Sequence, residues 1–325
     1  LNTGGSNVAV GRSALENNST ASNNTAVGKD ALIANTTGHS LVAVGDSALK
    51  ANTTALANTA VGRAALEATT TGASNTAVGR SALQVNTTGA ENVAVGLSAL
   101  DANTTGSNNV AVGRNALSGN TTAANNTAIG DSCMFLNTTG TNNTAVGNSA
   151  LIANTTGTNN TGIGHNALVA NTEAIHNTGI GNLALAAVTT GTRNTCVGSG
   201  AGDAITTGSK HTIVGRYNGN TGGLDIRTAT NHIVLADGDG NPRGIFDGSG
   251  NFTVQSGGVK SLAVYNNTTG TSANMVVDSA GGFARSTSSL RYKNTVNDAT
   301  HGLTELLALR PVTYKGNNDG DTVFG

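Results

Sequence analysis

The sequence has no tryptophan, only two prolines, and aromatic residues make up 3% of its 325 positions. Charged residues are also scarce, at 11%, and the formal net charge is −1. Nucleic-acid-binding proteins normally carry a surplus of Lys and Arg, so the charge balance argues against that class. Disordered chains combine low hydrophobicity with many charges or prolines, whereas 37% of this chain is apolar. So few aromatic side chains favour thin layers of small residues over one bulky core.

Long hydrophobic runs are missing as well. No apolar run approaches the ~18 residues that a membrane-spanning helix needs, so we expect no membrane insertion. No signal peptide is recognisable at the first residues, LNTGG. The six histidines and two cysteines show no metal-ligand spacing, so we expect no cofactor and no disulfide.

What the sequence does contain is a strict internal repeat. Glycine closes the segment AVG, or a variant of it, every 17 residues without insertion or deletion. The thirteen glycines are Gly11, Gly28, Gly45, Gly62, Gly79, Gly96, Gly113, Gly130, Gly147, Gly164, Gly181, Gly198 and Gly215. The consensus unit reads N-T-A-V-G-x-x-A-L-x-x-N-T-T-G-x-x. A short strict period is typical of a solenoid, in which each coil contacts only its neighbours.

Each unit predicts one coil. NTAVG is typical of a short strand in which Thr and Val point to one side and Asn and Ala to the other. The following xxAL is either a second strand or a helical turn, and NTTG turns the chain. Thirteen coils stacked at ~4.8 Å would give a rod roughly 60 Å long.

Stacking places equivalent residues in columns. We expect the dry interior to consist of the Val/Ile column, from Val10 to Val214, and the Leu column that begins with Leu15, Leu32 and Leu49. We expect an amide ladder from the asparagines that precede the strand. These are Asn7, Asn24, Asn58, Asn75, Asn92 and their later equivalents.

The unit SNTAVGRSALQVNTTG resembles the head repeats of trimeric autotransporter adhesins, the YadA-like head, and the shafts of many phage tail fibres. The resemblance covers about residues 1–215 and implies a left-handed parallel β-roll assembled three to a bundle. We therefore expect an all-β fold, a repetitive parallel β-solenoid or β-roll of 17-residue coils, in a homotrimer. Leu1 to Gly4 fit the end of a preceding unit, so we expect the array to continue toward the N-terminus.

The phase of the repeat explains several residues that would otherwise suggest chemistry. Cys133 and Cys196 stand at alanine positions and Met134 at a leucine position, so all three are interpreted as buried apolar residues. GSGAGD (198–203) is a degenerate unit and not a phosphate-binding loop. His211 stands in the asparagine column, and a metal on the axis of a trimer is the alternative role for the histidines.

Two sets of charged residues remain. Asp30 and Asp46 are the only acidic pair of the array expected to approach each other, although glycoside hydrolysis usually needs two carboxylates about 5–10 Å apart. The position after the repeat glycine carries a weak basic stripe, interrupted by Asp46 and Asp131. We interpret it as a solvated face, with contact to an anionic glycan as the alternative. The stripe consists of Arg12, Lys29, Arg63, Arg80 and Arg114.

The period ends after Gly215. Residues 231–255 are typical of short strands joined by tight Gly, Asp and Asn turns. Their DGDGN segment (237–241) mimics a calcium loop, but Pro242 stands where that loop requires glycine, so a hairpin turn is the better interpretation. We expect another hairpin at 273–288 and a helix at 297–311 that ends before proline.

Three C-terminal segments resemble the intramolecular chaperone family found on endosialidase tailspikes, L-shaped tail fibres and neck appendages of phages. They are STSSLRYKNTV (286–296), GLTELLALRPVTYK (302–315) and GDTVFG (320–325). In this family a serine followed five residues later by a lysine cleaves the chain just before the serine. The resemblance implies Ser288 as nucleophile, Lys293 as its base, and cleavage between Thr287 and Ser288. Ser289 stands where many members have Asp, and a chaperone that stays attached uncut is the alternative.

The expected organisation is a solenoid at 1–215, a hairpin-rich connector at 216–287, and the N-terminal part of a chaperone domain at 288–325. We expect a structural and adhesive fibre on the virion surface, such as a phage tail fibre. Its partners would be itself, a host receptor or glycan, and other virion proteins through a preceding region. The alternative is a trimeric adhesin on a bacterial surface. A depolymerase spike is disfavoured because a pair of catalytic carboxylates is missing, and the only enzymatic activity expected is self-cleavage.

Overall fold

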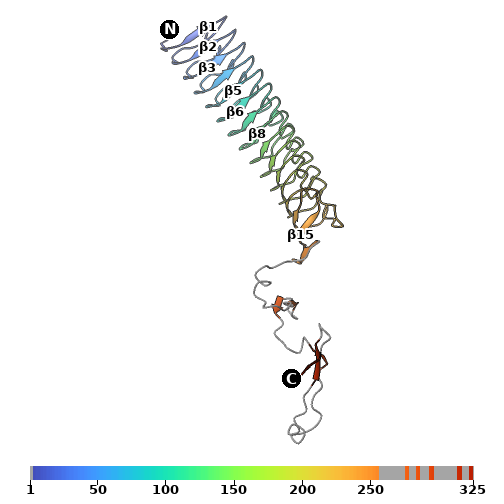
Figure 1. The fold of residues 1–325 in the computed structure, drawn as a ribbon. Coiled ribbons are helices and arrows are strands. Elements are labelled where there is room, and N and C mark those ends of the chain that lie inside the picture. The colour runs from blue at the N-terminus through green and yellow to red at the C-terminus, as the bar shows by residue number, and fades with distance from the viewer. Residues whose placement is uncertain are drawn as a thin grey trace. The chain divides into compact units, whose positions relative to one another are not determined.

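The computed structural model describes residues 3–255 and, after them, five short strands. The chain divides into two units, Leu1–Gly258 and Val259–Gly325, which are described separately. All regular structure in the described residues is β-structure (Figure 1). Accordingly, that part of the chain holds no helix long and apolar enough to cross a membrane.

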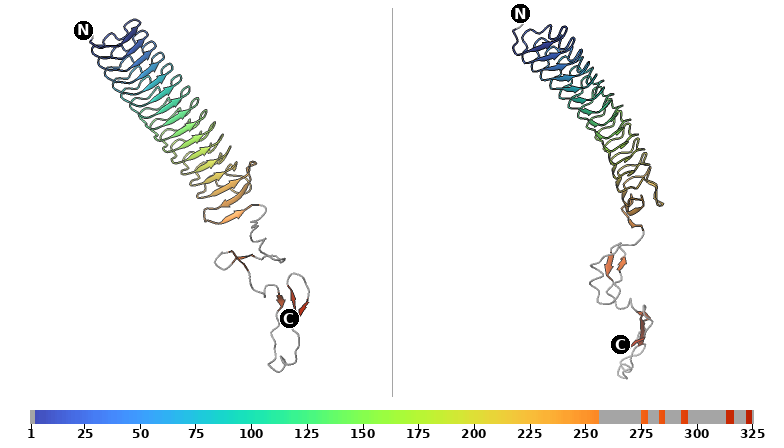
Figure 2. Two further views of the ribbon diagram at one scale, coloured as in Figure 1. Left: turned by 60° about the vertical axis from the view of Figure 1, so that its left-hand side comes forward. Right: turned by 45° about the horizontal axis from the view of Figure 1, so that its top comes forward.

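The first unit is a β-solenoid in which every coil adds one three-residue strand to a single sheet (Figure 2). Adjacent strands are parallel, and each residue pairs with the residue 17 positions further on, as Ala60 does with Ala77. This confirms the predicted fold class and period. The strands are β1 (Val8–Val10), β2 (Thr25–Val27), β3 (Val42–Val44), β4 (Thr59–Val61), β5 (Thr76–Val78), β6 (Val93–Val95), β7 (Val110–Val112), β8 (Thr127–Ile129), β9 (Thr144–Val146), β10 (Thr161–Ile163), β11 (Thr178–Ile180), β12 (Thr195–Val197) and β13 (Thr212–Val214).

The sheet continues beyond the last 17-residue period. β14 (Ile233–Ala236) pairs in parallel with β13, with Thr212 opposite Ile233. β15 (Pro242–Phe246) and β16 (Phe252–Val254) then extend it as an antiparallel meander. The longer coil between β13 and β14 is filled by the fully buried Tyr217, whose hydroxyl donates a 2.6 Å hydrogen bond to the carbonyl of Leu224.

The interior is made of alanine and leucine. The predicted Leu column is confirmed, since Leu32, Leu49 and their equivalents are fully buried. The prediction that the Val/Ile column also lies in the interior is wrong. Thr and Val do share one face of the strand, as expected, but that face is outward, and the central residue of each strand, alanine in β1 to β9, is the inward one.

The narrow interior explains this arrangement. In β10, Gly162 replaces the central alanine, and a Cβ added there would lie 3.4 Å from Cγ of Leu151. An alanine methyl therefore already contacts the leucine across the coil, and a branched side chain would overpack this space. Leucine fills the interior from one side and alanine closes it from the other.

The xxAL segment is neither a strand nor a helical turn. Its leucine adopts left-handed backbone geometry, with φ of 52° at Leu32, 50° at Leu49 and 50° at Leu66. Such geometry costs a bulky residue about 1–2 kcal/mol. Complete burial of leucine contributes about 1.5–3 kcal/mol, and its amide also bonds the next coil, as Leu49 N does to Ala65 O at 3.0 Å.

Asparagines form two buried ladders along the solenoid. In the strand ladder, which precedes the strands and was predicted, the Oδ1 of Asn58 accepts from the backbone N of Asn75 at 2.7 Å and from its Nδ2 at 3.2 Å. The turn ladder, formed by the asparagine of NTTG, was not predicted. There, Asn103 Nδ2 donates to Asn86 Oδ1 at 2.8 Å and to Gly106 O at 2.9 Å. The turn asparagines therefore join neighbouring coils besides reversing the chain.

The repeat glycine is required by close approach of the coils. Gly79 has φ of 135°, and a Cβ there would lie 2.4 Å from the carbonyl oxygen of Gly96 in the next coil. Neither the backbone angle nor the contact admits a side chain.

The second unit contains two small sheets. β17 (Met275–Val277) pairs antiparallel with β18 (Phe283–Arg285), which confirms the hairpin predicted at 273–288. β19 (Lys293–Thr295), β20 (Thr313–Gly316) and β21 (Thr322–Phe324) form an antiparallel sheet in that order. The helix predicted at 297–311 lies outside the described residues.

Candidate functional site on the outer face of the sheet

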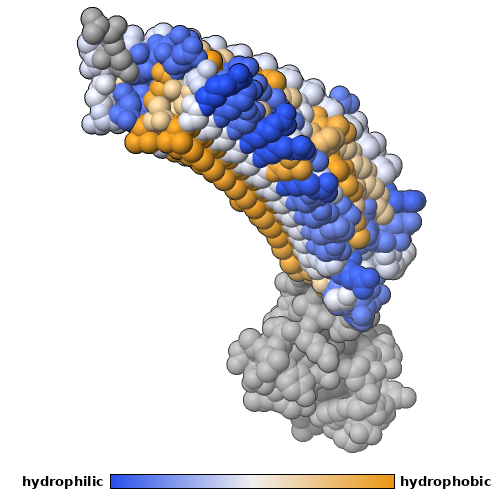
Figure 3. Space-filling view, turned by 90° about the horizontal axis from the view of Figure 1, so that it is seen from above, coloured by the Kyte–Doolittle hydropathy of each residue, from blue (hydrophilic) through white to orange (hydrophobic). Residues whose placement is uncertain are grey.

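The outward face of the sheet carries an exposed apolar row. The third residue of every strand from β1 to β13 is Val or Ile, and it points away from the interior. Val78, Ile129 and Ile163 are 37%, 40% and 37% exposed. Figure 3 shows an unbroken apolar stripe along the concave side of the solenoid. We call this row the apolar stripe.

The outward positions of the strands carry no charge. The first residue of each of these strands, which shares the outward face, is Thr or Val throughout. Monomeric soluble proteins rarely expose a contiguous apolar patch of more than a few hundred Å². A solvated sheet would also carry charged side chains on such a face. The composition of this face therefore favours a covered surface.

The stripe widens on the last three strands. Ile233 and Leu235 of β14 are 43% and 50% exposed, and Phe246 of β15 and Phe252 of β16 are 40% and 52% exposed. The two phenyl rings stack with centroids 4.6 Å apart and an interplanar angle of 28°. We call these four residues the aromatic end.

A polar row follows the repeat glycines beside the stripe. Lys29 Nζ lies 3.2 Å from Asp30 and 3.8 Å from Asp46. The structure therefore brings both predicted carboxylates to one ammonium group, as ion-pair partners. These surface pairs contribute little stability, and they reduce the net charge of the basic stripe predicted from the sequence.

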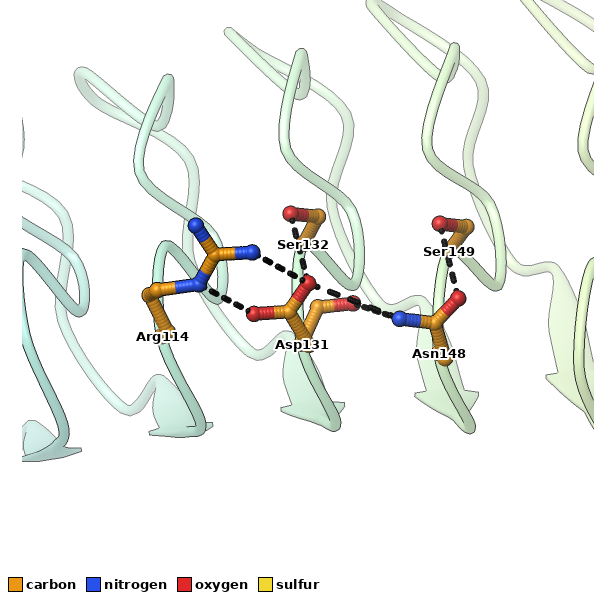
Figure 4. Close-up of polar contacts among 5 residues, drawn as sticks. All are labelled: Arg114, Asp131, Ser132, Asn148 and Ser149. Atoms are coloured by element: carbon orange, nitrogen blue, oxygen red, sulfur yellow. Dashed lines mark hydrogen bonds and ion pairs between the residues drawn. The ribbon is translucent and has the colours of Figure 1, made fainter.

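The best-formed part of this row is shown in Figure 4. Arg114 donates to Asp131 through Nε at 2.7 Å and Nη2 at 3.0 Å, a bidentate pair between adjacent coils. Asn148 Nδ2 reaches the same carboxylate at 3.4 Å. The Arg114 hydrogen bonds hold the pKa of Asp131 below its usual range. Asp131 is therefore ionised at neutral pH and unsuited to donate a proton in catalysis.

The cysteines are buried and inert, as predicted. Both are fully buried, and Cys133 Sγ donates to the carbonyl of Ala145 at 3.2 Å. Burial raises the pKa of the Cys133 thiol to about 12 and shifts the pKa of Cys196 in the same direction. Neither side chain presents a thiolate nucleophile.

The DGDGN segment forms the hairpin turn predicted from the sequence. Asp237 Oδ1 accepts hydrogen bonds from the backbone N of Asp239 at 3.1 Å and of Asn241 at 2.9 Å. Its other oxygen pairs with Arg243 Nε at 2.8 Å. These backbone hydrogen bonds and the guanidinium lower the pKa of Asp237 to about 2.

His211 occupies the strand ladder, as its phase predicted. Its backbone N donates to Asn194 Oδ1 at 3.0 Å, and its Nδ1 accepts from the backbone N of His232 at 3.2 Å. The fully buried Nε2 has no hydrogen-bond partner. Like the asparagines of the strand ladder, the His211 side chain accepts a hydrogen bond from the following coil. Unlike them, it donates none.

The predicted cleavage residues lie mostly outside the described part of the chain. Thr287 and Ser288 are not described, and Lys293 is the first residue of β19, with its backbone opposite Gly316. Self-cleavage by Ser288 and Lys293 therefore stays a prediction.

No protein family, curated protein or solved structure matches this chain. The solenoid and its surfaces are therefore the features from which a function can be inferred. The apolar stripe was missed from the sequence, although its signal was present: Val or Ile stands in all thirteen units, and in twelve of them the preceding residue is smaller and could fill the interior instead.

Proposed function

We propose that the chain is the shaft of a homotrimeric structural and adhesive fibre on a virion surface. The observation that supports assembly is the apolar stripe, which faces outward, partly or largely exposed, and is uncharged from β1 to β13. A partner that covers it continuously needs the same rise per coil along the whole length. A second copy of the chain meets this requirement. The number three and the virion setting rest on the resemblance to adhesin heads and phage fibre shafts.

Assembly is tested by sedimentation equilibrium. The chain has a mass of 32.0 kDa, and the proposal expects a trimer at micromolar concentration. Replacing Val78 and Ile129 by Lys would bury charges without partners, so this variant should be monomeric. Thr105→Lys, at an exposed turn, is the matched control and should remain trimeric. A monomeric unsubstituted chain would contradict the proposal.

The proposal includes release of a C-terminal chaperone by self-cleavage. In this step the Ser288 hydroxyl attacks the carbonyl of Thr287 while Lys293 accepts its proton. The peptide bond then breaks as Lys293 returns the proton to the leaving amine of Ser288, which leaves Thr287 joined to the Ser288 oxygen as an ester. Water then hydrolyses the resulting ester. A lysine performs this role when desolvation or a nearby cation, such as Arg291, keeps it neutral.

Intact-mass spectrometry of the full-length protein and of its Ser288→Ala variant tests this part. The proposal expects a product ending at Thr287 and an uncut variant. If both chains stay whole, the assignment of Ser288 and Lys293 is wrong, and the C-terminal part is at most a permanent trimerisation module. The virion setting is tested by electron microscopy of virions labelled with antibodies against residues 3–255.

A further inference from the structure

The apolar stripe favours self-association but does not fix the position of one copy along another. The stripe repeats every coil, and its residues are Val or Ile in all thirteen strands. A shift of one coil therefore exchanges equivalent contacts along most of the length, so the stripe specifies register weakly. Another feature must distinguish the aligned arrangement from the shifted ones.

The aromatic end differs from the rest of the stripe. On the outward face of β14, Ile233 and Leu235 stand where β13 has Thr212 and Val214. The stacked rings of Phe246 and Phe252 extend this face, and they have no equivalent in the repeat units. The apolar surface is therefore widest, and its side chains largest, at one end of the solenoid.

A buried glycine underlies the surface of this end. Gly244 of β15 lies opposite Leu235 of β14. A Cβ at Gly244 would lie 3.6 Å from Cε2 of Phe252 and 3.8 Å from Cδ1 of Leu235. Because glycine supplies no side chain there, Leu235 and Phe252 cover the buried Gly244 and form the outward surface at this point.

We propose that the aromatic end sets the axial register between copies of the chain. This inference rests on the proposed self-assembly. Parallel, aligned copies bring their aromatic ends together, and each presents the exposed rings of Phe246 and Phe252 and the exposed side chains of Ile233 and Leu235. A shift of one coil would oppose Ile233 and Leu235 of β14 to Thr212 and Val214 of β13, and it would leave Phe252 of one copy without a counterpart and exposed to water. An antiparallel arrangement would place the aromatic ends at opposite tips of the assembly.

The aromatic end would remain part of the shaft after the proposed self-cleavage. Its residues precede the proposed cleavage bond between Thr287 and Ser288. Removal of a C-terminal chaperone would therefore leave this alignment element on the shaft. The chaperone would help the copies assemble, and the aromatic end would keep them aligned afterwards.

The test compares the pairing of two adjacent coils. One full-length chain carries Val112→Cys on the stripe and a second carries Ile129→Cys. Both also carry Cys133→Ala and Cys196→Ala, so that no other cysteine is present. They are co-expressed in equal amounts and oxidised, and disulfide-linked peptides are quantified by mass spectrometry. Aligned copies should form disulfides between two residues 112 and between two residues 129. A shift of one coil should instead form the mixed disulfide between residues 112 and 129.

The decisive variant combines Phe246→Thr and Phe252→Thr, and the matched control combines Val78→Thr and Val95→Thr in the middle of the stripe. The inference expects the mixed link to rise about tenfold in the phenylalanine variant only, with the oligomer retained in sedimentation. An unchanged link pattern, an equal rise in the control, or a monomeric phenylalanine variant would each overturn it. A monomeric unsubstituted chain would overturn the assembly proposal as well, which separates the two failures.

Discussion

Asn52 and Thr69 occupy the same position in consecutive coils, and the turn ladder is broken between them. The Oδ1 of Asn52 is buried without a hydrogen-bond partner. On the other side of the break, Asn86 Nδ2 reaches the Thr69 hydroxyl only at 3.5 Å, whereas Asn103 donates to Asn86 at 2.8 Å. One substitution in the repeat thus weakens two interactions between coils.

Replacing Thr69 by Asn should repair both. The new amide would donate to Asn52 and accept from Asn86, and satisfying a buried polar atom contributes about 1–2 kcal/mol. We expect stabilisation of that size in denaturant unfolding and slower amide exchange in the adjacent coils. Thr71→Asn, at an exposed position of the same turn, should leave both measurements unchanged. Equal or lower stability of Thr69→Asn would show that the ladder bonds do not contribute as described.

Breaking an intact ladder should have the opposite effect. Asn103→Ala removes the donor to Asn86 and the acceptor of Asn120 Nδ2, which now bond at 2.8 Å and 2.9 Å. Because buried partners are left unsatisfied, we expect a loss of about 2–4 kcal/mol in the free energy of unfolding. The exposed Asn148→Ala serves as the control and should change stability by less than about 0.5 kcal/mol. A similar loss in both variants would contradict the special role of the ladder.

The repeat glycine gives a third prediction. Gly79→Ala places a methyl group 2.4 Å from the Gly96 carbonyl and strains a backbone with φ of 135°. We expect destabilisation by about 3 kcal/mol or more, with local loss of amide protection in β5 and β6. At Gly238 an added Cβ meets nothing within 4 Å, so Gly238→Ala should be close to neutral. Wild-type protection in Gly79→Ala would contradict the close approach.

His211 makes stability depend on pH. Burial, and then the neighbouring His232, lowers the pKa of His211 to about 4, against about 6.5 for an unfolded histidine. Between these values the unfolded chain binds a proton that the folded chain does not. The free energy of unfolding should therefore fall as the pH is lowered from about 6.5 to about 4, on the order of 2 kcal/mol.

The variant His211→Asn restores the repeat residue and should remove this dependence, while the exposed His39→Asn should retain it. Denaturant unfolding at pH 7, 5.5 and 4.5 measures the difference. The lowered carboxyl pKa values of Asp225 and Asp237, both about 2, affect stability only below this window, as the pH falls from about 4 to about 2. An unchanged pH profile in His211→Asn would assign the effect to other groups.

The sequence predicts which residues form columns, but it does not predict which columns face the interior. The period alone places Leu49 over Leu66 and Asn58 beside Asn75, because every coil has the same length. Strand alternation also separates Ala77 from its neighbours Thr76 and Val78. It does not say which side is interior, since alanine and valine are both apolar. That choice depends on the width of the coil.

The width of the coil depends on the xxAL segment, whose leucine has a left-handed backbone conformation. Leucine disfavours the left-handed conformation, so no local pattern predicts that Leu49 adopts it with φ of 50°. Only the stacking of coils makes this geometry favourable, through burial and the hydrogen bond to the next coil. For the same reason the candidate site was not predicted. When the valine column is assigned to the interior, the outer face of the sheet has no apolar row. The chemistry expected of Ser288 depends on residues outside the described part of the chain.

The direction of the two asparagine ladders has a consequence for how such a chain can evolve. Each paired amide donates toward the preceding coil and accepts from the following one, so every boundary at which both ladders are intact is formed by the same hydrogen bonds. Duplicating or deleting one whole unit recreates those hydrogen bonds, whereas any other insertion interrupts them. The length of the shaft is therefore free to drift by unequal recombination between repeats, in steps of one coil, while the ends of the array remain unchanged.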